Sequence, residues 1–383
     1  MSAVPEKSDK AADQTPASVP ATSAPPAPDI LVDAANVKKY FPVMGGVLRR
    51  QIGSVYAVDD VSLQIYRGEK LGLVGESGCG KTTFGRTILR LEKATGGCVT
   101  MDGQDVLALQ GDALKKMRRR MQIIFQDPYG SLNPRMPISD IIGEGLLAQA
   151  DKTNRWGVRS IRDGRVGDYL EAVGLRRDYA RRYPHEFSGG QRQRIGIARA
   201  LALGPEFVVC DEPVSALDVS IQSQILNLLS DLRTEFNLTY LFIAHNLSVV
   251  QYFCDRIGVM YLGKIVEVAA TDTLYESPQH PYSVALLSAI PVPDPRVRKK
   301  RLVLRGDVPS PANPPSGCRF HTRCWLRERL GNPAECSATE PPLRQISSGH
   351  MVACHFAEQV TSEAVAESAA SQSVIDTAVA EDN

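Results

Sequence analysis

The octet at residues 75–82 constrains this chain more than any other feature, because it reads Gly-Glu-Ser-Gly-Cys-Gly-Lys-Thr. The apolar run 71–74 before it predicts a short buried strand, and the pattern of 83–91 after it predicts a helix with one apolar face. Glycines let backbone N–H groups close on phosphate oxygens, and the helix start adds the positive end of its dipole. The octet therefore predicts a nucleoside triphosphate site, in which Lys81 reaches the β- and γ-phosphates and the Thr82 hydroxyl holds Mg²⁺. A glycine-rich turn without a ligand is the alternative, and we expect such a chance match in roughly one chain of this length in a hundred.

Two further motifs follow the octet along the chain. Residues 188–191 (Ser-Gly-Gly-Gln) open the helical stretch 193–201, which predicts a second helix start able to bind an anion. The apolar run 207–210 leads into Asp211 and Glu212. We expect Asp211 to hold Mg²⁺ through water and Glu212 to polarise the water that attacks the γ-phosphate. An ordinary turn and a strand ending in solvated acids are the alternatives, and the order of the motifs disfavours both.

In these motifs and their order the chain resembles the ATP-binding cassette (ABC) family over most of residues 34–356. The resemblance implies an α/β fold: a P-loop NTPase domain with a RecA-like core, a helical signature subdomain and an antiparallel β subdomain, followed by a small Cys- and Pro-rich C-terminal extension. It also implies that Gln126 senses Mg²⁺ and water, that Asp218 belongs to the D-loop, and that His245 contacts the γ-phosphate. The implied contacts to ATP from the octet region are Gly75, Glu76, Ser77, Gly78, Cys79, Gly80, Lys81, Thr82 and Thr83.

The resemblance is imperfect at two positions and ambiguous at a third. Phe187 stands where the family signature usually has leucine, and Asn246 follows the histidine where aspartate is common. The family stacks adenine on an aromatic side chain upstream of the P-loop. Phe41 is the matching position, and Tyr40 and Tyr56 are the alternatives because residues 42–55 read as an insertion.

The same resemblance implies a dimer of ATPase subunits. A P-loop alone leaves one face of the triphosphate open, and in the family the signature of one subunit closes over the nucleotide of the other. Only one cassette is present, so the second must come from an identical chain or a sister subunit, and the resemblance favours a sister. ATP binding would close the pair and hydrolysis would release it. The residues implied to act in trans are Ser188, Gly189, Gly190 and Gln191.

The C-terminal part of the chain indicates the substrate class. Residues 280–291, 306–311 and 314–324 resemble the extension of the ATPase subunits in dipeptide, oligopeptide and nickel importers. With 126–134 and 183–187, the resemblance is closest to the F-type subunit of dipeptide/oligopeptide importers. It implies an ATPase that couples ATP hydrolysis to peptide uptake across the inner (cytoplasmic) membrane. A nickel or glutathione importer, or a soluble ABC ATPase acting on DNA or ribosomes, is the alternative.

Partners and location follow from this resemblance and from composition. The implied partners are a sister ATPase, two membrane permease subunits and an extracytoplasmic peptide-binding protein, with the chain peripheral on the cytoplasmic face. No run of 18 apolar residues occurs, and no basic segment followed by an apolar one opens the chain, so we expect neither a membrane span nor a secretory signal. With 44 Lys and Arg against 43 Asp and Glu, the net charge of +1 gives no case for nucleic-acid binding.

The chain divides by composition and motif into four parts. Residues 1–30 are rich in Ala and Pro and predict a disordered tail, and the acidic residues 357–383 predict another. We expect the ATPase domain at 31–278, with 137–187 as its helical subdomain. Residues 279–356 form the expected extension.

Four of the eight cysteines crowd into that extension: Cys318, Cys324, Cys336 and Cys354. A cytosolic ATPase should not keep disulfides, so the cluster predicts a metal site. Four thiolates suit a 4Fe–4S cluster or structural zinc, and the lack of a short Cys-x₂₋₄-Cys knuckle favours the cluster. Some relatives in the peptide-importer group are thought to hold one at matching cysteines. Unliganded thiols, or an iron- or redox-responsive regulator with ATP as a secondary switch, are the alternatives.

Overall fold

The computed structural model describes residues 29–45, 50–149, 155–290, 302–362 and 365. Of the two tails expected at 1–30 and 357–383, residues 1–28, 363–364 and 366–383 lie outside the described residues. The start of the second is described: a 3₁₀ turn spans Ala357–Gln359, and Ala357 is buried. Among the helices in those ranges, none combines the length and apolar character needed to cross a bilayer.

The elements follow in mixed α/β order. The strands are β1 (Ile30–Gly45), β2 (Arg50–Tyr66), β3 (Lys70–Val74), β4 (Gly96–Met101), β5 (Gln104–Asp105), β6 (Met121–Ile124), β7 (Phe207–Asp211), β8 (Thr239–Ile243), β9 (Arg256–Tyr261), β10 (Lys264–Ala270), β11 (Arg344–Ser347) and β12 (His350–Val352). The α-helices are α1 (Lys81–Ile88), α2 (Gly111–Arg120), α3 (Ile138–Gln149), α4 (Arg155–Ala172), α5 (Gly189–Leu201), α6 (Val219–Phe236), α7 (Leu247–Phe253), α8 (Thr271–Glu276), α9 (Pro281–Ser288), α10 (Trp325–Arg329) and α11 (Glu335–Ala338). Four 3₁₀ turns are η1 (Arg177–Arg181), η2 (Pro184–Glu186), η3 (His321–Arg323) and η4 (Ala357–Gln359).

An eight-stranded sheet in the order β11-β12-β10-β9-β3-β8-β7-β6 forms the centre of the molecule. The strands from β9 to β6 are parallel, and every residue of β7 and β8 is buried, as expected when both faces of a parallel sheet are covered. The carboxyl ends of parallel strands meet at one edge, where ligands bind in open α/β sheets. The octet after β3, the acids after β7 and the histidine after β8 therefore come together.

A second, antiparallel sheet has the order β2-β1-β4-β5 and packs on α1. Its β1–β2 hairpin is long, with Tyr40 opposite Tyr56 and Gly45 opposite Arg50. The segment 42–55, which reads as an insertion in the sequence, is thus an extension of this hairpin. Buried apolar side chains of both strands share a core with Phe84 of α1.

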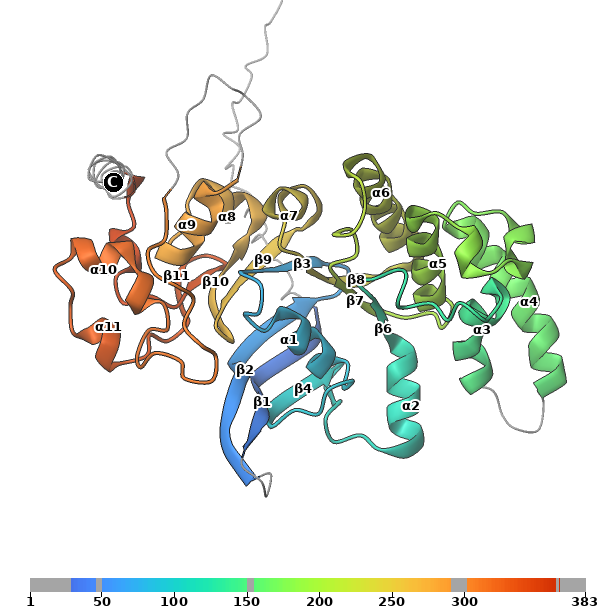
Figure 1. The fold of residues 1–383 in the computed structure, drawn as a ribbon, viewed down its shortest axis with the longest axis horizontal. Helices are drawn as coiled ribbons and strands as arrows, with labels where there is room; N and C mark the ends of the chain where they lie inside the picture. The colour runs from blue at the N-terminus through green and yellow to red at the C-terminus, as the bar shows by residue number, and fades with distance from the viewer. Residues whose placement is uncertain (1–28, 46–49, 150–154, 291–301, 363–364, 366–383) are drawn as a thin grey trace, which may run out of the picture.

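The helices α3, α4 and α5 form a layer at one end of the molecule (Figure 1). Their contact is apolar, because Ile142, Leu170 and Ile195 are fully buried in a common core. The described residues therefore contain helical structure over most of the subdomain expected at 137–187.

The C-terminal extension lies at the opposite end from those helices (Figure 1). It does not stand apart from the ATPase, because β12 pairs with β10 and places Val352 opposite Glu267. Phe320 and Trp325 are buried in the same apolar core as the central sheet. The extension therefore adds β12 and β11 to the edge of the main sheet.

Candidate nucleotide site

The octet forms the loop between β3 and α1, and two of its glycines are required by close backbone contacts. A Cβ at Gly75 would lie 2.1 Å from the carbonyl oxygen of Met260, and one at Gly80 would lie 2.0 Å from that of Ala57. Gly80 also has φ +108°, which side chains rarely allow. The loop therefore has a fixed, tightly packed path that ends at the start of α1.

Lys81 is buried, and its ammonium group points back into the loop. Its Nζ donates to the carbonyl oxygens of Gly75, at 2.8 Å, and Glu76, at 3.0 Å. These bonds hold the ammonium group inside the loop. When a triphosphate binds there, the ammonium can exchange the carbonyl oxygens for phosphate oxygens as its hydrogen-bond acceptors.

Thr82 and Asp211 supply the oxygen atoms expected for Mg²⁺. The Thr82 hydroxyl donates to Asp211 Oδ1 at 2.6 Å, and Asp211 is only 1% exposed. Its second oxygen, Oδ2, is buried without a hydrogen-bond partner, although Arg86 lies 3.6 Å away. Burial raises the pKa of Asp211, against the hydrogen bond from Thr82 and the charge of Arg86. A hydroxyl beside an incompletely satisfied carboxylate is a donor set that fits Mg²⁺.

Glu212 is the centre of a three-residue constellation. Its Oε2 accepts a hydrogen bond from Gln126 Nε2 at 2.8 Å and lies 3.1 Å from His245 Nδ1. The three side chains follow β6, β7 and β8, so the sheet edge brings together the three catalytic candidates of the sequence.

The signature residues form the capped start of α5. Ser188 Oγ accepts from the Gln191 N–H at 3.4 Å, and Gln191 Oε1 accepts from the Ser188 N–H at 3.1 Å. In the described part of the chain no hydrogen bond joins these residues to the octet. Asp218 is the N-cap of α6. The signature is therefore preformed but does not complete the site of its own chain.

The aromatic side chains that could stack on adenine have different neighbours in the structure. The Tyr40 hydroxyl donates to Asp59, and its ring meets Tyr56 edge-on with centroids 4.8 Å apart. Burial, together with Asp59, raises the pKa of Tyr40. Phe41 carries the Lys39 ammonium 4.5 Å from its ring centroid. All three rings therefore have close neighbours, and the stacking of adenine on Phe41, or alternatively on Tyr40 or Tyr56, stays a prediction.

The four cysteines of the extension are reduced, and they line one small cavity of about 10 Å³. Burial raises the pKa of Cys318 to about 11 and that of Cys354 to about 12, so these thiols are protonated at neutral pH. Across the described ranges, no group of three or more His, Cys, Asp or Glu side chains is arranged so that it could hold a metal ion. The geometry thus gives the predicted metal site no support beyond the shared cavity.

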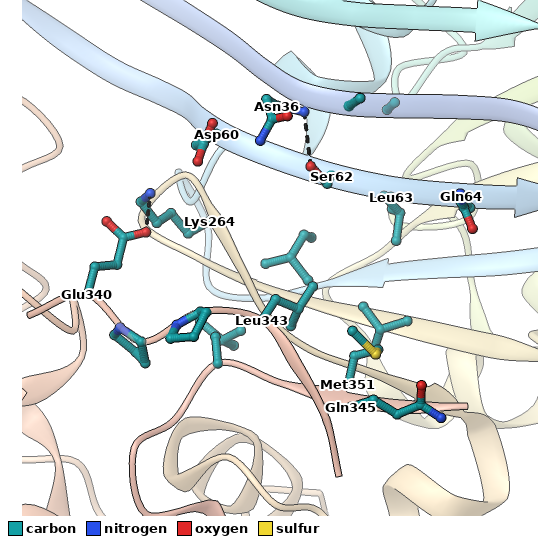
Figure 2. Close-up of a pocket in the computed structure, with 18 of the residues that line it drawn as sticks. Asn36, Asp60, Ser62, Leu63, Gln64, Lys264, Glu340, Leu343, Gln345 and Met351 are labelled. Atoms are coloured by element: carbon teal, nitrogen blue, oxygen red, sulfur yellow. Dashed lines mark hydrogen bonds and ion pairs between the residues drawn. The ribbon is translucent and has the colours of Figure 1, made fainter. Parts of the chain in front are cut away.

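A cavity of about 890 Å³ lies elsewhere (Figure 2). It opens between the β2 strand, the β10 strand and the extension, with Leu63 and Leu343 on opposite walls and a Lys264–Glu340 ion pair at one end. It contains no residue of the octet. At the nucleotide site, Lys81 and Asp211 are buried, while Gln126 and His245 are exposed.

Two residues that touch the octet could not be found from sequence. The Tyr282 hydroxyl accepts from the Glu76 N–H, and Arg323 forms an ion pair with the Glu76 carboxylate. They lie 206 and 247 residues from Glu76 along the chain, so no local pattern signals either contact.

Comparison with protein-family models gives two matches. Residues 58–215 match the model described as "ABC transporter", and residues 266–329 match "Oligopeptide/dipeptide transporter, C-terminal region". The chain is 51% identical to the oligopeptide transport ATP-binding protein AppF of Bacillus subtilis (strain 168), over 86% of this chain and 98% of that protein. It is 49% identical to the oligopeptide transport ATP-binding protein OppF of Salmonella typhimurium, over 85% and 96%.

Solved structures give the same likeness at the level of fold. A dimeric ATP-binding cassette in a post-hydrolysis state, bound to ADP and phosphate, is 31% identical with a TM-score of 0.54, over 63% of this chain and 98% of that chain. A bacterial ABC transporter cassette, also dimeric, is 29% identical with the same TM-score. These likenesses confirm the predicted P-loop, ABC-type α/β fold.

Proposed function

The chain belongs to the ABC transporter family of ATP-binding subunits, and from that premise we propose that it powers an importer of dipeptides and oligopeptides. It is an ATPase, and its family assembles with membrane permeases and a second ATPase subunit. The proposal of peptide import is supported by the match of residues 266–329 and by the names of AppF and OppF. The observation that carries the ATPase role is the Glu212 carboxylate held between Gln126 and His245, beside the Thr82–Asp211 pair.

In the proposed mechanism the octet binds the phosphates through backbone N–H groups and Lys81. Thr82 and Asp211 would hold Mg²⁺, which neutralises charge on the β- and γ-phosphates. Glu212 orients a water molecule and accepts its proton as the oxygen attacks the γ-phosphorus. The bond from that phosphorus to the bridging oxygen breaks, and ADP and phosphate leave. Gln126 and His245 position Glu212 and the γ-phosphate.

The proposed complex places the signature of this chain over the nucleotide of a sister ATPase. Gly189 and Gly190 are the first two residues of α5, where backbone N–H groups have no partner within the helix and can bind a triphosphate held by another chain. The pair would sit peripherally on the cytoplasmic face of the inner membrane, below two permease subunits that receive cargo from an extracytoplasmic peptide-binding protein.

Uptake assays test the substrate class. A strain that lacks this chain is supplied with the wild-type chain or with Glu212→Gln, and uptake of labelled di-, tri- and oligopeptides, nickel and glutathione is measured. We expect peptide uptake to return only with the wild type. Restored uptake of nickel or glutathione alone would contradict peptide import, and co-purification with ribosomes or DNA instead of permeases would contradict a transport role.

For the cysteines we propose that Cys318, Cys324, Cys336 and Cys354 close around a metal, as a 4Fe–4S cluster or, alternatively, zinc. The support is their common cavity. Anaerobic purification followed by iron, sulfide and zinc analysis tests this, with Cys98→Ser as the control outside the cavity. Metal that is absent, or unchanged in Cys318→Ser, would exclude the site.

A further inference from the structure

We propose that the C-terminal extension tunes the affinity of the phosphate loop for ATP: Arg323 neutralises the carboxylate of Glu76, and Tyr282 fixes the backbone of the same residue. Both are positioning residues, and the inference rests on the ATPase function described above.

The contact between the extension and the loop is bidentate and sheltered. Arg323 Nη1 lies 2.9 Å from Glu76 Oε2, and Nη2 lies 3.3 Å from Oε1. The Arg323 side chain is 8% exposed and that of Glu76 28%. Paired donors of this kind fix the orientation of a carboxylate as well as its charge.

Every polar group of Glu76 has a partner. Its N–H donates to the Tyr282 hydroxyl at 2.8 Å, and its carbonyl oxygen accepts from Lys81 Nζ at 3.0 Å. Its carboxylate is bound by Arg323. Tyr282 and Arg323 belong to the extension, and Lys81 is the lysine expected to bind phosphate. The extension and the phosphate-binding lysine therefore contact the same residue, Glu76.

Tyr282 and Arg323, which bind Glu76, are held in place by packing against aromatic side chains. The rings of Tyr261 and Tyr282 lie 4.7 Å apart, and Phe320 packs on both at 5.2 and 5.4 Å. All three side chains are almost fully buried. Arg323 follows Phe320 by three residues and lies 3.5 Å from the Tyr261 hydroxyl, so it cannot leave Glu76 without disturbing this packing.

The electrostatic consequence follows from the place of Glu76 in the loop. An unpaired Glu76 carboxylate would repel the triphosphate that the loop binds. A carboxylate paired with Arg323 carries almost no net charge, so it repels the triphosphate much less. Loss of the Arg323 charge should therefore weaken ATP binding about tenfold. Because the repulsion arises from Glu76, removing the Glu76 charge should restore binding even without Arg323.

The test is a charge cycle in the assembled transporter. The KM for ATP, kcat and nucleotide affinity are measured for wild type, Arg323→Gln, Glu76→Gln and the double variant, at low and high salt. We expect Arg323→Gln to raise the KM about tenfold with kcat within about twofold, an effect that weakens with salt. Glu76→Gln should lower the KM, because Arg323 then adds an unpaired positive charge beside the loop, and the double variant should keep a KM close to that of wild type.

Controls separate this role from simple attachment of the extension. Arg344→Gln removes an ion pair that joins the extension to Glu358, just beyond its end and away from the octet, and should leave the KM unchanged. Tyr282→Phe removes only the hydroxyl on the Glu76 N–H and should raise the KM a few-fold.

Two results would overturn the inference: an unchanged KM in Arg323→Gln, or an equally raised KM in the double variant, which would mean a purely structural contact. If Arg323→Gln does not fold, Glu76→Gln decides alone, since it should lower the KM and its salt dependence. Wild-type complexes without ATPase activity would instead contradict the proposed function, not this inference.

Discussion

At the scale of single residues, the site depends on backbone positions that tolerate few side chains. Glu212 has φ +47°, an uncommon conformation for a residue other than glycine. Its N–H is bonded to the Ile243 carbonyl oxygen at 3.0 Å, which ties the end of β7 to β8 and aims the carboxylate at Gln126 and His245. Such conformations persist where surrounding structure enforces them, and they cluster at functional sites.

The role of Glu212 is tested by Glu212→Gln, which keeps the shape and removes the proton acceptor. We expect ATP binding to persist and turnover in the assembled complex to fall by about 100-fold or more. Phosphate release and bound-nucleotide content measure the two effects. Glu235→Gln, an exposed acid on α6, is the matched control and should behave as wild type. Undiminished hydrolysis in Glu212→Gln would remove it from the role of base.

Gly80→Ala tests the fixed path of the phosphate loop. The new Cβ would meet the Ala57 carbonyl oxygen, so we expect nucleotide affinity to be lost and the free energy of unfolding to fall by about 2 kcal/mol. Gly78→Ala is the control, because it also has positive φ but no atom within 4 Å of its Cβ. Chemical denaturation and nucleotide titration give both quantities, and equal effects of the two substitutions would count against the packing argument.

At the scale of elements, one charge network joins both sheets. Arg120 at the end of α2 binds Asp102 and Glu206, and Arg67 after β2 binds the same two acids. Although burial would raise the pKa of Asp102, the hydrogen bond from Arg120 and the charge of Arg67 lower it. The hydrogen bond from Arg120 likewise lowers the pKa of Glu206.

This network should stabilise the fold in a pH-dependent way. Because the folded-state pKa values of the two acids are lowered, its contribution is present above their unfolded pKa, about 4, and is lost as pH falls through the folded values. We expect Arg120→Gln to cost about 1 kcal/mol at pH 7, since the partners are partly exposed, and less at pH 3. Urea unfolding at both pH values measures this. Arg177→Gln, an exposed arginine with two acidic partners, should cost nothing measurable, and an equal cost at pH 3 and pH 7 for Arg120→Gln would contradict the linkage.

At the scale of the whole molecule, the proposed function requires a second chain to complete the nucleotide site. At the start of α5, Ser188 is exposed and its side-chain hydrogen bond is to Gln191, the next residues are partly buried, and His245 is exposed. The exposure of Ser188 and His245 is expected if two ATPase chains bury their nucleotides between them.

Gly189→Asp tests this trans arrangement. The position has room, since a Cβ there would lie 3.7 Å from Leu217, so Gly189→Ala should be tolerated and serves as the control. A carboxylate facing the triphosphate of the partner should block closure, and we expect ATP-dependent association of the ATPase pair and transport to be lost. Normal transport by Gly189→Asp would contradict a role in trans.

How far the sequence predicts this molecule depends on the range of each interaction. The octet, Asp211 and Glu212 lie in short motifs whose flanking strands and helices are local, and the parallel sheet then brings Gln126 and His245 to them. The attachment of the extension was not predictable, because pairing of β12 with β10 and the contact of Arg323 with Glu76 join segments far apart in the chain. For the four cysteines of the extension, the sequence indicates a metal site. Their spacing along the chain does not, however, determine how the thiols are arranged in space.

The late position of β12 in the chain matters during synthesis on the ribosome. A ribosome makes every motif of the ATP site before it makes the hairpin that covers the outer edge of β10. During that interval the nascent chain contains every catalytic motif, but the outer edge of β10 has no partner strand. An unpaired edge of this kind can pair with other chains. Synthesis stopped before residue 343 should therefore yield aggregates in place of a smaller working enzyme, and a soluble, active product of that length would disprove it.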